Sequence, residues 1–329
     1  MKVLFIFRKL NVKFQSIEEL FKQIIVSLSE KVHCEAYSVN YYSIGLKNRI
    51  RILLDVRKLS SSIFHITGDI HFIALILPRK RTLLTIHDLG THDKLRGIAK
   101  FIFWLFWIYL PVKRLRYITV ISEATKRHLL SLVSINPAKI EVIHNMLIGA
   151  FKSVDSAFNK NCPVILQIGI TENKNILRLS EALNGIKCKL IILGIPNEDQ
   201  KKTLRLNNVN FEIRHGLSRT QVIDLYESCD LVTFVSTHEG FGLPIIEANA
   251  TGRAVITSNI SAMPEVAGGS ALLVNPFSVI DIHNGIIKLI NDDLYRKDLI
   301  EKGFKNVRRF TPELIAEQYL DLYKKILKN

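Results

Sequence analysis

Short apolar runs of strand length recur along the chain, and a segment with helical periodicity follows each of them. Runs of this kind are typical of parallel strands that are buried on both faces beneath helices. A polar stretch at residues 152–161 divides them into two series, at 3–7, 63–67, 83–86, 117–121 and 140–143, and at 164–168, 190–193, 210–213, 231–235, 254–256 and 271–274. Two series predict an α/β fold with two doubly wound, Rossmann-like domains.

The length of the chain also favours two domains, because 329 residues exceed what one hydrophobic core usually holds. We place the first domain at residues 1–150, the second at 151–311 and a final helix at 312–329. Open α/β sheets bind ligands beyond the carboxyl ends of their strands. We therefore expect the ligand in a cleft between the carboxyl edges of the two sheets.

The chain carries a formal net charge of +15, so its surface should attract an anionic partner. Nucleic acid is the less favoured partner, because no helix-turn-helix, zinc-finger or RNA-binding aromatic signature accompanies the charge. An anionic membrane leaflet or an anionic substrate fits the sequence better.

The four cysteines occur singly, without the spacing of a zinc site, and indicate small buried residues of a reducing compartment. The apolar opening at residues 2–7 is too short for the core of a signal peptide. We expect this opening to form the first strand of a cytoplasmic protein.

Two glutamates, Glu239 and Glu247, enclose the sequence Gly-Phe-Gly-Leu-Pro-Ile-Ile. The run at 231–235 predicts a strand before them, and Pro244 fits the first turn of a helix that would include Glu247 in that turn. Glycines at the strand-to-helix turn let backbone amides approach a ligand, and a helix N-terminus binds phosphate. The pattern indicates a ligand with both an anion and hydroxyls, such as a nucleotide sugar.

The segment from Glu239 to Gly252 resembles the signature of the family 4 glycosyltransferases. The likeness continues in order through residues 254–258, 263–266 and 271–276. Upstream, Gly169 with Lys174 and Asn175 resembles the diphosphate-contacting loop of that family. Thr85-Ile-His-Asp88 resembles its amino-domain histidine motif.

The resemblance implies the two-domain GT-B fold, with the donor in the second domain, the acceptor on the side of the first, and the final helix packed back on the first. It implies transfer of a sugar from a nucleotide sugar, with retention of anomeric configuration. The acceptor would be a glycan or a lipid-linked glycan, in the synthesis of cell-surface polysaccharide.

The resemblance also implies roles for individual residues. Glu239 would face the donor sugar and Glu247 the ribose, while His87 would contact the donor from the first domain. His215 would lie near the nucleobase. The diphosphate would be held by the loop and turn residues Gly169, Lys174, Asn175, Gly240, Phe241, Gly242 and Leu243.

Each of these residues also has a simpler structural interpretation. Lys174 could be a solvated loop lysine, Glu247 a carboxylate favoured by the helix dipole, and His87 a residue bonded to its own loop. Glu239 is harder to explain in this way, because a carboxylate between an apolar strand and a glycine turn is costly if it binds nothing.

Two positions depart from the family pattern. Residue 170, frequently Arg in relatives, is Ile170 here, which removes a second cation from the diphosphate loop. The loop after the first strand has no glycine, and we expect Arg8 or Lys13 to bind there instead.

The histidines form no His-x-x-x-His pattern, and no Asp-x-Asp motif of metal-dependent sugar transferases is present. We therefore predict metal-independent catalysis with no cofactor, and with a UDP- or GDP-sugar as donor substrate. Cations of the protein would replace magnesium at the diphosphate.

The run at 101–110 holds both tryptophans of the chain among ten apolar residues. As a helix it would be about 15 Å long, too short to span a bilayer. Basic residues flank it between 96 and 116, which suits an anchor at an anionic membrane surface. The alternative is a buried helix of the first domain.

The sequence therefore predicts a cytoplasmic glycosyltransferase of the hexosyltransferase type, at most peripheral on the inner membrane. A nucleotide-sugar epimerase of the same fold is one alternative. A catalytically silent glycan-binding or membrane scaffold protein is the other.

Overall fold

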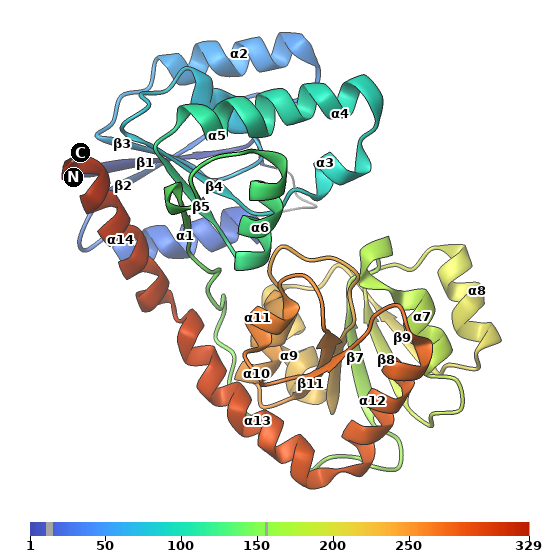
Figure 1. Cartoon of the computed structure of the whole chain (residues 1–329). Helices are drawn as coiled ribbons and strands as arrows, with labels where there is room; N and C mark the ends of the chain where they lie inside the picture. Colours follow the sequence, from blue (N-terminus) through green and yellow to red (C-terminus); the bar gives the residue numbers. More distant parts are fainter. Residues whose placement is uncertain (11–15, 155–156, 329) are drawn as a thin grey trace. The chain divides into compact units, whose positions relative to one another are not determined.

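The computed structural model describes residues 1–10, 16–154 and 157–328 (Figure 1). The chain divides into two compact units. The first consists of Met1–Ile148 together with Thr311–Asn329, and the second of Gly149–Phe310. Each unit is built around its own parallel sheet, as the two series of apolar runs predict.

The first unit contains a six-stranded parallel sheet in the order β2-β1-β3-β4-β5-β6. Its strands are β1 (Lys2–Phe7), β2 (His33–Ser38), β3 (Ile63–Ile66), β4 (Thr82–Ile86), β5 (Tyr117–Val120) and β6 (Ile140–Val142). Only β2 was not predicted from an apolar run. It lies at the edge of the sheet and its sequence, His-Cys-Glu-Ala-Tyr-Ser, is largely polar, because an edge strand is not enclosed on all sides.

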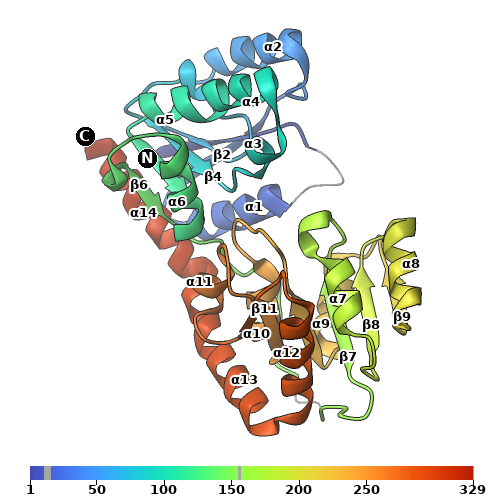
Figure 2. The same ribbon diagram turned by 45° about the vertical axis from the view of Figure 1, so that its right-hand side comes forward.

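Helices cover both faces of this sheet, and alternate residues of β1 point to each face. Val3, Phe5 and Phe7 face α1 (Ser16–Leu28) and α14 (Pro312–Lys328). Leu4 and Ile6 face the opposite core. That core lies beneath α2 (Gly45–Arg57) and α5 (Leu110–Arg114), as Figures 1 and 2 show. Residues of η1 (His71–Leu75) also belong to it. The unit is completed by α3 (Gly90–Lys94), α6 (Glu123–Leu132) and η3 (Pro137–Lys139).

The apolar run at 101–110 lies in one continuous helical segment: α4 (Gly97–Phe103), the π-helical turn η2 (Trp104–Tyr109), and α5. Trp107 and Ile108 are buried in the core. Both indoles face inward, because Trp104 Nε1 donates to Leu132 O at 3.1 Å and Trp107 Nε1 to Asp69 O at 2.6 Å.

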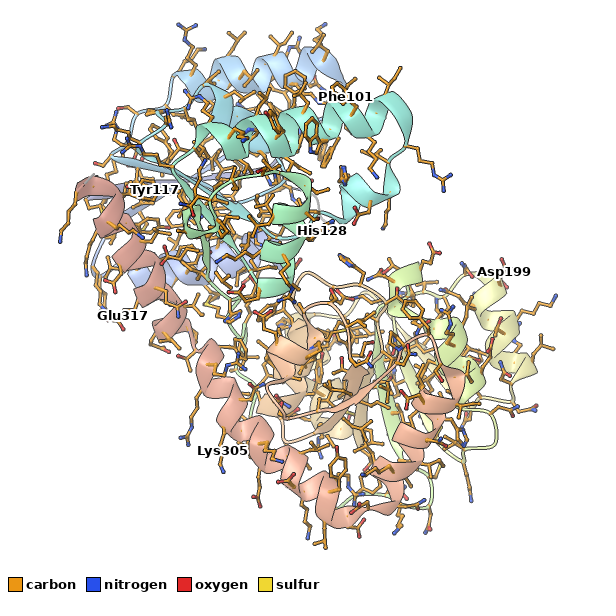
Figure 3. All side chains as sticks on the ribbon, in the orientation of Figure 1. Phe101, Tyr117, His128, Asp199, Lys305 and Glu317 are labelled. Carbon is orange, nitrogen blue, oxygen red and sulfur yellow. The ribbon has the colours of Figure 1, made fainter. Side chains whose placement is uncertain are left out.

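The other side of this helical segment is exposed. Ile98 is 79% exposed and Phe101 58%, and Ile102 and Phe106 are also exposed; Figure 3 labels Phe101 on α4. The run is therefore buried on one face, as the second alternative predicts, while the membrane anchor on its exposed face stays a prediction. Among the described residues, no helix has the length and apolar character needed to cross a membrane.

The second unit contains a six-stranded parallel sheet in the order β12-β11-β10-β7-β8-β9. Its strands are β7 (Val164–Ile168), β8 (Lys189–Leu193), β9 (Phe211–Arg214), β10 (Leu231–Phe234), β11 (Ala254–Ser258) and β12 (Leu272–Val274). All six follow the predicted runs within two residues at either end. The fold prediction of two doubly wound Rossmann-like domains is therefore confirmed.

Helices again enclose this second sheet. Their bounds are α7 (Ile176–Ala182), α8 (Glu198–Leu206), α9 (Arg219–Ser228), α10 (Leu243–Ala250), α11 (Met263–Ala267), α12 (Val279–Asn291) and α13 (Asp293–Val307), with η4 (Glu172–Lys174) and η5 (Arg308–Phe310). α7 and α12 pack over the core around Ile165, Leu231 and Ile256. Because β7 and β10 are neighbours, the loops at their carboxyl ends meet. The predicted site residues of the second unit, except His215, lie in these two loops and at the starts of the helices after them.

Candidate functional site

Glu239 lies just beyond the carboxyl end of β10, where the chain turns towards α10. Its carboxylate oxygen Oε1 accepts hydrogen bonds from Lys174 Nζ at 2.6 Å and Asn173 Nδ2 at 3.1 Å. Its backbone is held by Ser261, whose hydroxyl contacts both the N–H and the carbonyl of Glu239. The carboxylate is therefore fixed beside a cation, and it is half-buried beyond the carboxyl end of β10.

Lys174 comes from the loop after β7, at the end of η4. Its ammonium group lies 4.7 Å from the centre of the Phe234 ring and its side chain is 19% exposed. Gly169 lies beneath it with φ +83°, and a Cβ there would come within 3.1 Å of Lys174 Cε. The predicted pairing of Gly169 with Lys174 therefore has a steric basis, since glycine leaves room for the lysine stem. Lys174 is an ion-paired residue and not a solvated loop lysine.

Asn175 adopts the left-handed conformation with φ 61° and is 4% exposed. Its amide donates to Val235 O at 3.0 Å and Pro276 O at 2.7 Å, and its carbonyl oxygen accepts from Arg178 at 3.0 Å. These bonds join the loops after β7, β10 and β12. The side chain of Asn175 holds the site together, so any contact with a diphosphate would have to come from its backbone.

The turn into α10 has the predicted form. Gly242 is the N-cap residue with φ +130°, and a Cβ there would lie 3.1 Å from Ile245 Cδ1. Leu243 begins the helix, and Pro244 follows in its first turn. Phe241 is buried with its ring packed edge-on against Phe310, so only its backbone can face a ligand. The turn, which begins at Gly240, presents the N-terminus of an eight-residue helix, where the first N–H groups have no partner within the helix.

Glu247 does not lie in the first turn of α10, and that prediction is wrong. It is the fifth residue of a helix that begins at Leu243, so it lies one turn further along and does not cap the helix dipole. Its side chain is 7% exposed. Oε1 accepts from Arg219 Nη2 at 2.6 Å and Oε2 from Tyr226 OH at 2.6 Å.

His215 follows β9 and is exposed, next to Gly216 with φ +65°. No described contact joins it to Glu239, Lys174 or Glu247. A pocket of about 790 Å³ lies at the carboxyl ends of β7 and β8, lined by residues of α7 and α8. Asn175 lines this pocket, but Glu239, Glu247 and Lys174 do not. The pocket therefore does not contain the Lys174–Glu239 ion pair.

In the first unit, His87 follows β4, as predicted. Its Nε2 lies 2.9 Å from Thr67 O, and because a carbonyl only accepts, Nε2 must carry the proton. Burial lowers the pKa of His87 to about 4. The imidazole is therefore neutral near pH 7, and its Nδ1 can accept a hydrogen bond from a hydroxyl but cannot donate one to a phosphate.

A small pocket of about 170 Å³ opens beside His87 at the carboxyl ends of β1, β3 and β4, and Arg8, Asp69 and Asp88 also line it. Arg8 Nε donates to the buried carboxylate of Glu18 at 2.7 Å, and its Nη1 lies 3.7 Å from Asp69. Arg8 is therefore held between two carboxylates at this pocket, and its predicted role in ligand binding stays a prediction. Lys13, the other basic residue predicted there, lies outside the described residues.

The remaining histidine of interest has a structural role. His65 is fully buried, with Nδ1 2.7 Å from Tyr323 OH of α14 and Nε2 2.7 Å from Thr85 Oγ1. Burial lowers its pKa to about 3. Within the described parts of the chain, no cluster of three or more His, Cys, Asp or Glu side chains could hold a metal ion.

Four residues of the site were not predicted from the sequence. Asn173 and Ser261 fix Glu239, and Arg219 and Tyr226 fix Glu247. Asn173 could have been found, because it adjoins the Lys174-Asn175 pair. The other three lie far from the motif in sequence, and only the packing of α9 and of the loop after β11 brings them to it.

The two units each match a glycosyltransferase family. Residues 150–306 match the family described as Glycosyl transferases group 1, and residues 26–147 match Glycosyltransferase Family 4. The serotype-specific mannosyltransferase WbdA of Escherichia coli is 28% identical over 204 residues, which are 61% of this chain and 22% of that protein. The chain thus spans about a fifth of the length of this relative.

Solved structures share the whole fold. Sucrose-phosphate synthase from Thermosynechococcus elongatus has a TM-score of 0.80 at 16% identity, covering 100% of this chain and 99% of that one. HepE of Anabaena, in complex with UDP and glucose, has a TM-score of 0.76 at 13% identity, covering 99% and 100%. At such identity the likeness concerns the fold, which is that of the GT-B glycosyltransferases.

Proposed function

We propose that this chain, whose two units are the two Rossmann-like domains of a GT-B glycosyltransferase, transfers a sugar from a nucleotide sugar to a glycan or lipid-linked glycan. The observation that carries the proposal is the meeting of Lys174, Glu239 and the N-terminus of α10 at neighbouring strand ends. A cation and a helix N-terminus suit a diphosphate, and a carboxylate suits the hydroxyls of a sugar.

Lys174 and the amides at the start of α10 would stabilise the charge that develops on the departing nucleoside diphosphate. The bond from the anomeric carbon to the diphosphate oxygen breaks, and the acceptor oxygen bonds to that carbon. The acceptor proton leaves with the diphosphate. We propose that these protein groups act without a metal ion and that the anomeric configuration is retained.

Glu239 would bind hydroxyls of the donor sugar and stabilise positive charge at the anomeric carbon. Its Oε1 is paired with Lys174 at 2.6 Å, so a bound diphosphate would draw the ammonium group towards its own oxygens. The exchange keeps each charge partnered throughout, because the lysine gains phosphate oxygens as the carboxylate gains sugar hydroxyls.

His87 would contribute from the first unit. With Nε2–H donating to Thr67 O, Nδ1 remains an acceptor, and this favours a sugar hydroxyl over the diphosphate as its partner. Asp69 and Asp88 in the same pocket offer further acceptors for hydroxyls. A pocket lined in this way suits a polyhydroxylated ligand.

WbdA is named a serotype-specific mannosyltransferase, and HepE was solved in complex with UDP and glucose. We propose a cell-surface polysaccharide as the product on the resemblance. We propose a UDP- or GDP-hexose as donor on the resemblance and on these likenesses. His215, exposed after β9, is the residue that we assign to the nucleobase.

We further propose that the first unit binds the cytoplasmic face of an anionic membrane. The exposed stripe of α4 and η2 is flanked by Arg96, Lys100 and Lys113. The adjacent α2 exposes a second stripe, at Leu46, Ile50 and Leu54. Residues 36–122 hold fourteen Lys and Arg against four Asp and Glu, so the apolar stripes lie in a strongly basic segment. Apolar stripes beside cations suit insertion at anionic headgroups.

A thermal-shift screen with UDP, GDP, ADP, CMP and their sugar conjugates, in EDTA, tests the proposed function. A ligand that binds only the folded state at one hundred times its Kd adds about 2.7 kcal/mol of stability. We expect a selective rise of Tm with one nucleoside diphosphate. A flat response at millimolar concentrations would favour a silent scaffold protein. A selective rise with isomerisation of the donor, and no transfer, would favour an epimerase.

A further inference from the structure

The carboxylate of Glu247 is gripped by two donors from a single helix. Arg219 begins α9 and Tyr226 lies seven residues later, two turns along, so both side chains project from the same face. Each takes a different oxygen: Arg219 Nη2 is 2.6 Å from Oε1, and Tyr226 OH is 2.6 Å from Oε2. The rotation of the carboxylate plane is therefore fixed.

Both donors are themselves held in place. Tyr226 is fully buried, its ring packs edge-on to Phe151 at 5.7 Å, and burial raises its pKa well above the ordinary value, so it stays a donor. The guanidinium of Arg219 lies 5.0 Å over the same Phe151 ring. Gly149, with φ +104°, leaves the space for it, because a Cβ there would lie 3.3 Å from Arg219 Nε.

The helix that carries the donors is fixed at both ends. Ser218 and Gln221 form a capping box at its N-terminus. Arg253 Nε donates to Tyr226 O near its C-terminus at 3.1 Å. Arg219, Tyr226 and Phe151 thus form a rigid frame, which we call the clamp, around one carboxylate.

Glu247 lies four residues beyond Leu243, about 6 Å along the helix axis from the proposed phosphate site. An ionised carboxylate has about four acceptor positions. Among the described residues two of them are occupied by the clamp, which leaves one on each oxygen. Two adjacent hydroxyls, such as those of a ribose, match what is left.

We infer that Arg219 and Tyr226 are positioning residues that hold Glu247 so that its two oxygens accept the 2′- and 3′-hydroxyls of the nucleotide ribose. The inference rests on the proposed function, since it requires a bound nucleotide. It adds that ribose recognition depends on α9 and on Phe151, where the chain enters the second unit.

If Arg219 and Tyr226 only stabilise the fold, their loss should not depend on the ribose hydroxyls of the ligand. A nucleotide that lacks these hydroxyls therefore distinguishes a structural role from the proposed positioning role. We would measure by calorimetry the Kd of UDP or GDP, whichever wild type binds, and of its 2′,3′-dideoxy analogue. The variants are Tyr226→Phe, Arg219→Gln and the conservative Arg219→Lys. Tyr295→Phe in α13 is a matched hydroxyl deletion elsewhere in the unit. Melting curves without ligand establish that each variant is folded.

We expect Tyr226→Phe and Arg219→Gln to weaken binding of the ribonucleotide about tenfold or more, as the loss of a charge-assisted bond predicts. The dideoxy analogue should lose less than about twofold, Arg219→Lys should recover part of the loss, and Tyr295→Phe should bind as wild type. An equal loss on both ligands, or none on either, would overturn the clamp. If wild type binds neither nucleotide, the proposed function fails and this inference with it. If Arg219→Gln does not fold, Tyr226→Phe, which removes one oxygen, decides the question.

Discussion

The ion pair of Lys174 and Glu239 is the contact whose removal best separates catalysis from stability. Its two side chains are 19% and 15% exposed, and the charged atoms are 2.6 Å apart. Lys174→Met keeps the stem that packs on Gly169 but leaves the carboxylate without its cation. Removing one partner of a fully buried pair costs about 3–5 kcal/mol, whereas an exposed pair contributes about 0–1 kcal/mol. For this partly buried pair we expect a loss of about 1–3 kcal/mol in the free energy of unfolding.

The effect on turnover should be larger. Removing one group that stabilises developing negative charge lowers kcat by a factor of about 10²–10³. We expect Lys174→Met to slow release of the nucleoside diphosphate from the donor by that factor, measured with EDTA present. Lys201→Met is the matched control, because Lys201 pairs with Glu198 at 2.8 Å on the surface of α8. It should keep full turnover and change stability by less than about 0.5 kcal/mol.

The double variant Lys174→Met with Glu239→Gln distinguishes the two effects. Without the carboxylate charge no ion is left unpaired, so stability should recover towards the wild-type value. Turnover should stay low, because neither charge remains at the reacting groups. The reasoning would be refuted if Lys174→Met kept turnover within a few-fold of wild type. It would also be refuted if turnover recovered together with stability in the double variant.

Three further changes test other parts of the structure. Gly242→Ala should lower the free energy of unfolding by about 1–3 kcal/mol, because Gly242 has a positive φ, and should also weaken nucleotide affinity. Gly185→Ala, with φ +81° and nothing within 4 Å, should lower stability alone; denaturant titrations with and without nucleotide would separate the two effects. The pKa of His87 falls from 6.5 to about 4 on folding, so the unfolded chain binds more protons between these values and stability should fall as pH drops through this window. In urea titrations at pH 7 and pH 5, His87→Gln should lose less stability than wild type between the two pH values. An equal loss in both proteins would contradict the assignment. Phe101→Gln should reduce sedimentation with anionic vesicles about tenfold or more, because the variant loses the burial of a phenylalanine ring in the membrane. Leu294→Gln, which alters an exposed leucine of the other unit, should sediment as wild type does, and equal sedimentation of the two variants would remove α4 from the membrane proposal.

The order of elements was predictable because a buried parallel strand needs a run of apolar residues, and eleven such runs are present. The strand β2 could not be found in this way. Its pairing with β1 provides backbone hydrogen bonds, which need no apolar side chains at the sheet edge. The turn into α10 was predictable for a local reason, since Gly242 and Pro244 each fit one backbone position.

The roles of individual polar residues were less predictable, because they depend on contacts between segments far apart in sequence. Asn175 was expected at the diphosphate, yet its amide bonds to Val235 and Pro276 and closes the loops around the site. Glu247 was placed in the first turn but is the fifth residue of α10, because a helix start read from Pro244 is uncertain by a residue or two. Nothing near Arg219 in the sequence indicates that it would reach Glu247.

The eight-residue separation of Glu239 and Glu247 gives the two carboxylates different surroundings, and these surroundings fit different tasks. Glu239 lies before the helix, in a turn, with one oxygen paired to a lysine that a diphosphate could draw away. Glu247 lies inside the helix, with both oxygens fixed by Arg219 and Tyr226. A residue that follows a changing charge during reaction benefits from an exchangeable partner. A residue that recognises an unchanging ribose benefits from a rigid one. The same motif therefore supplies one adaptable and one fixed carboxylate, on either side of the helix N-terminus to which we assign the diphosphate.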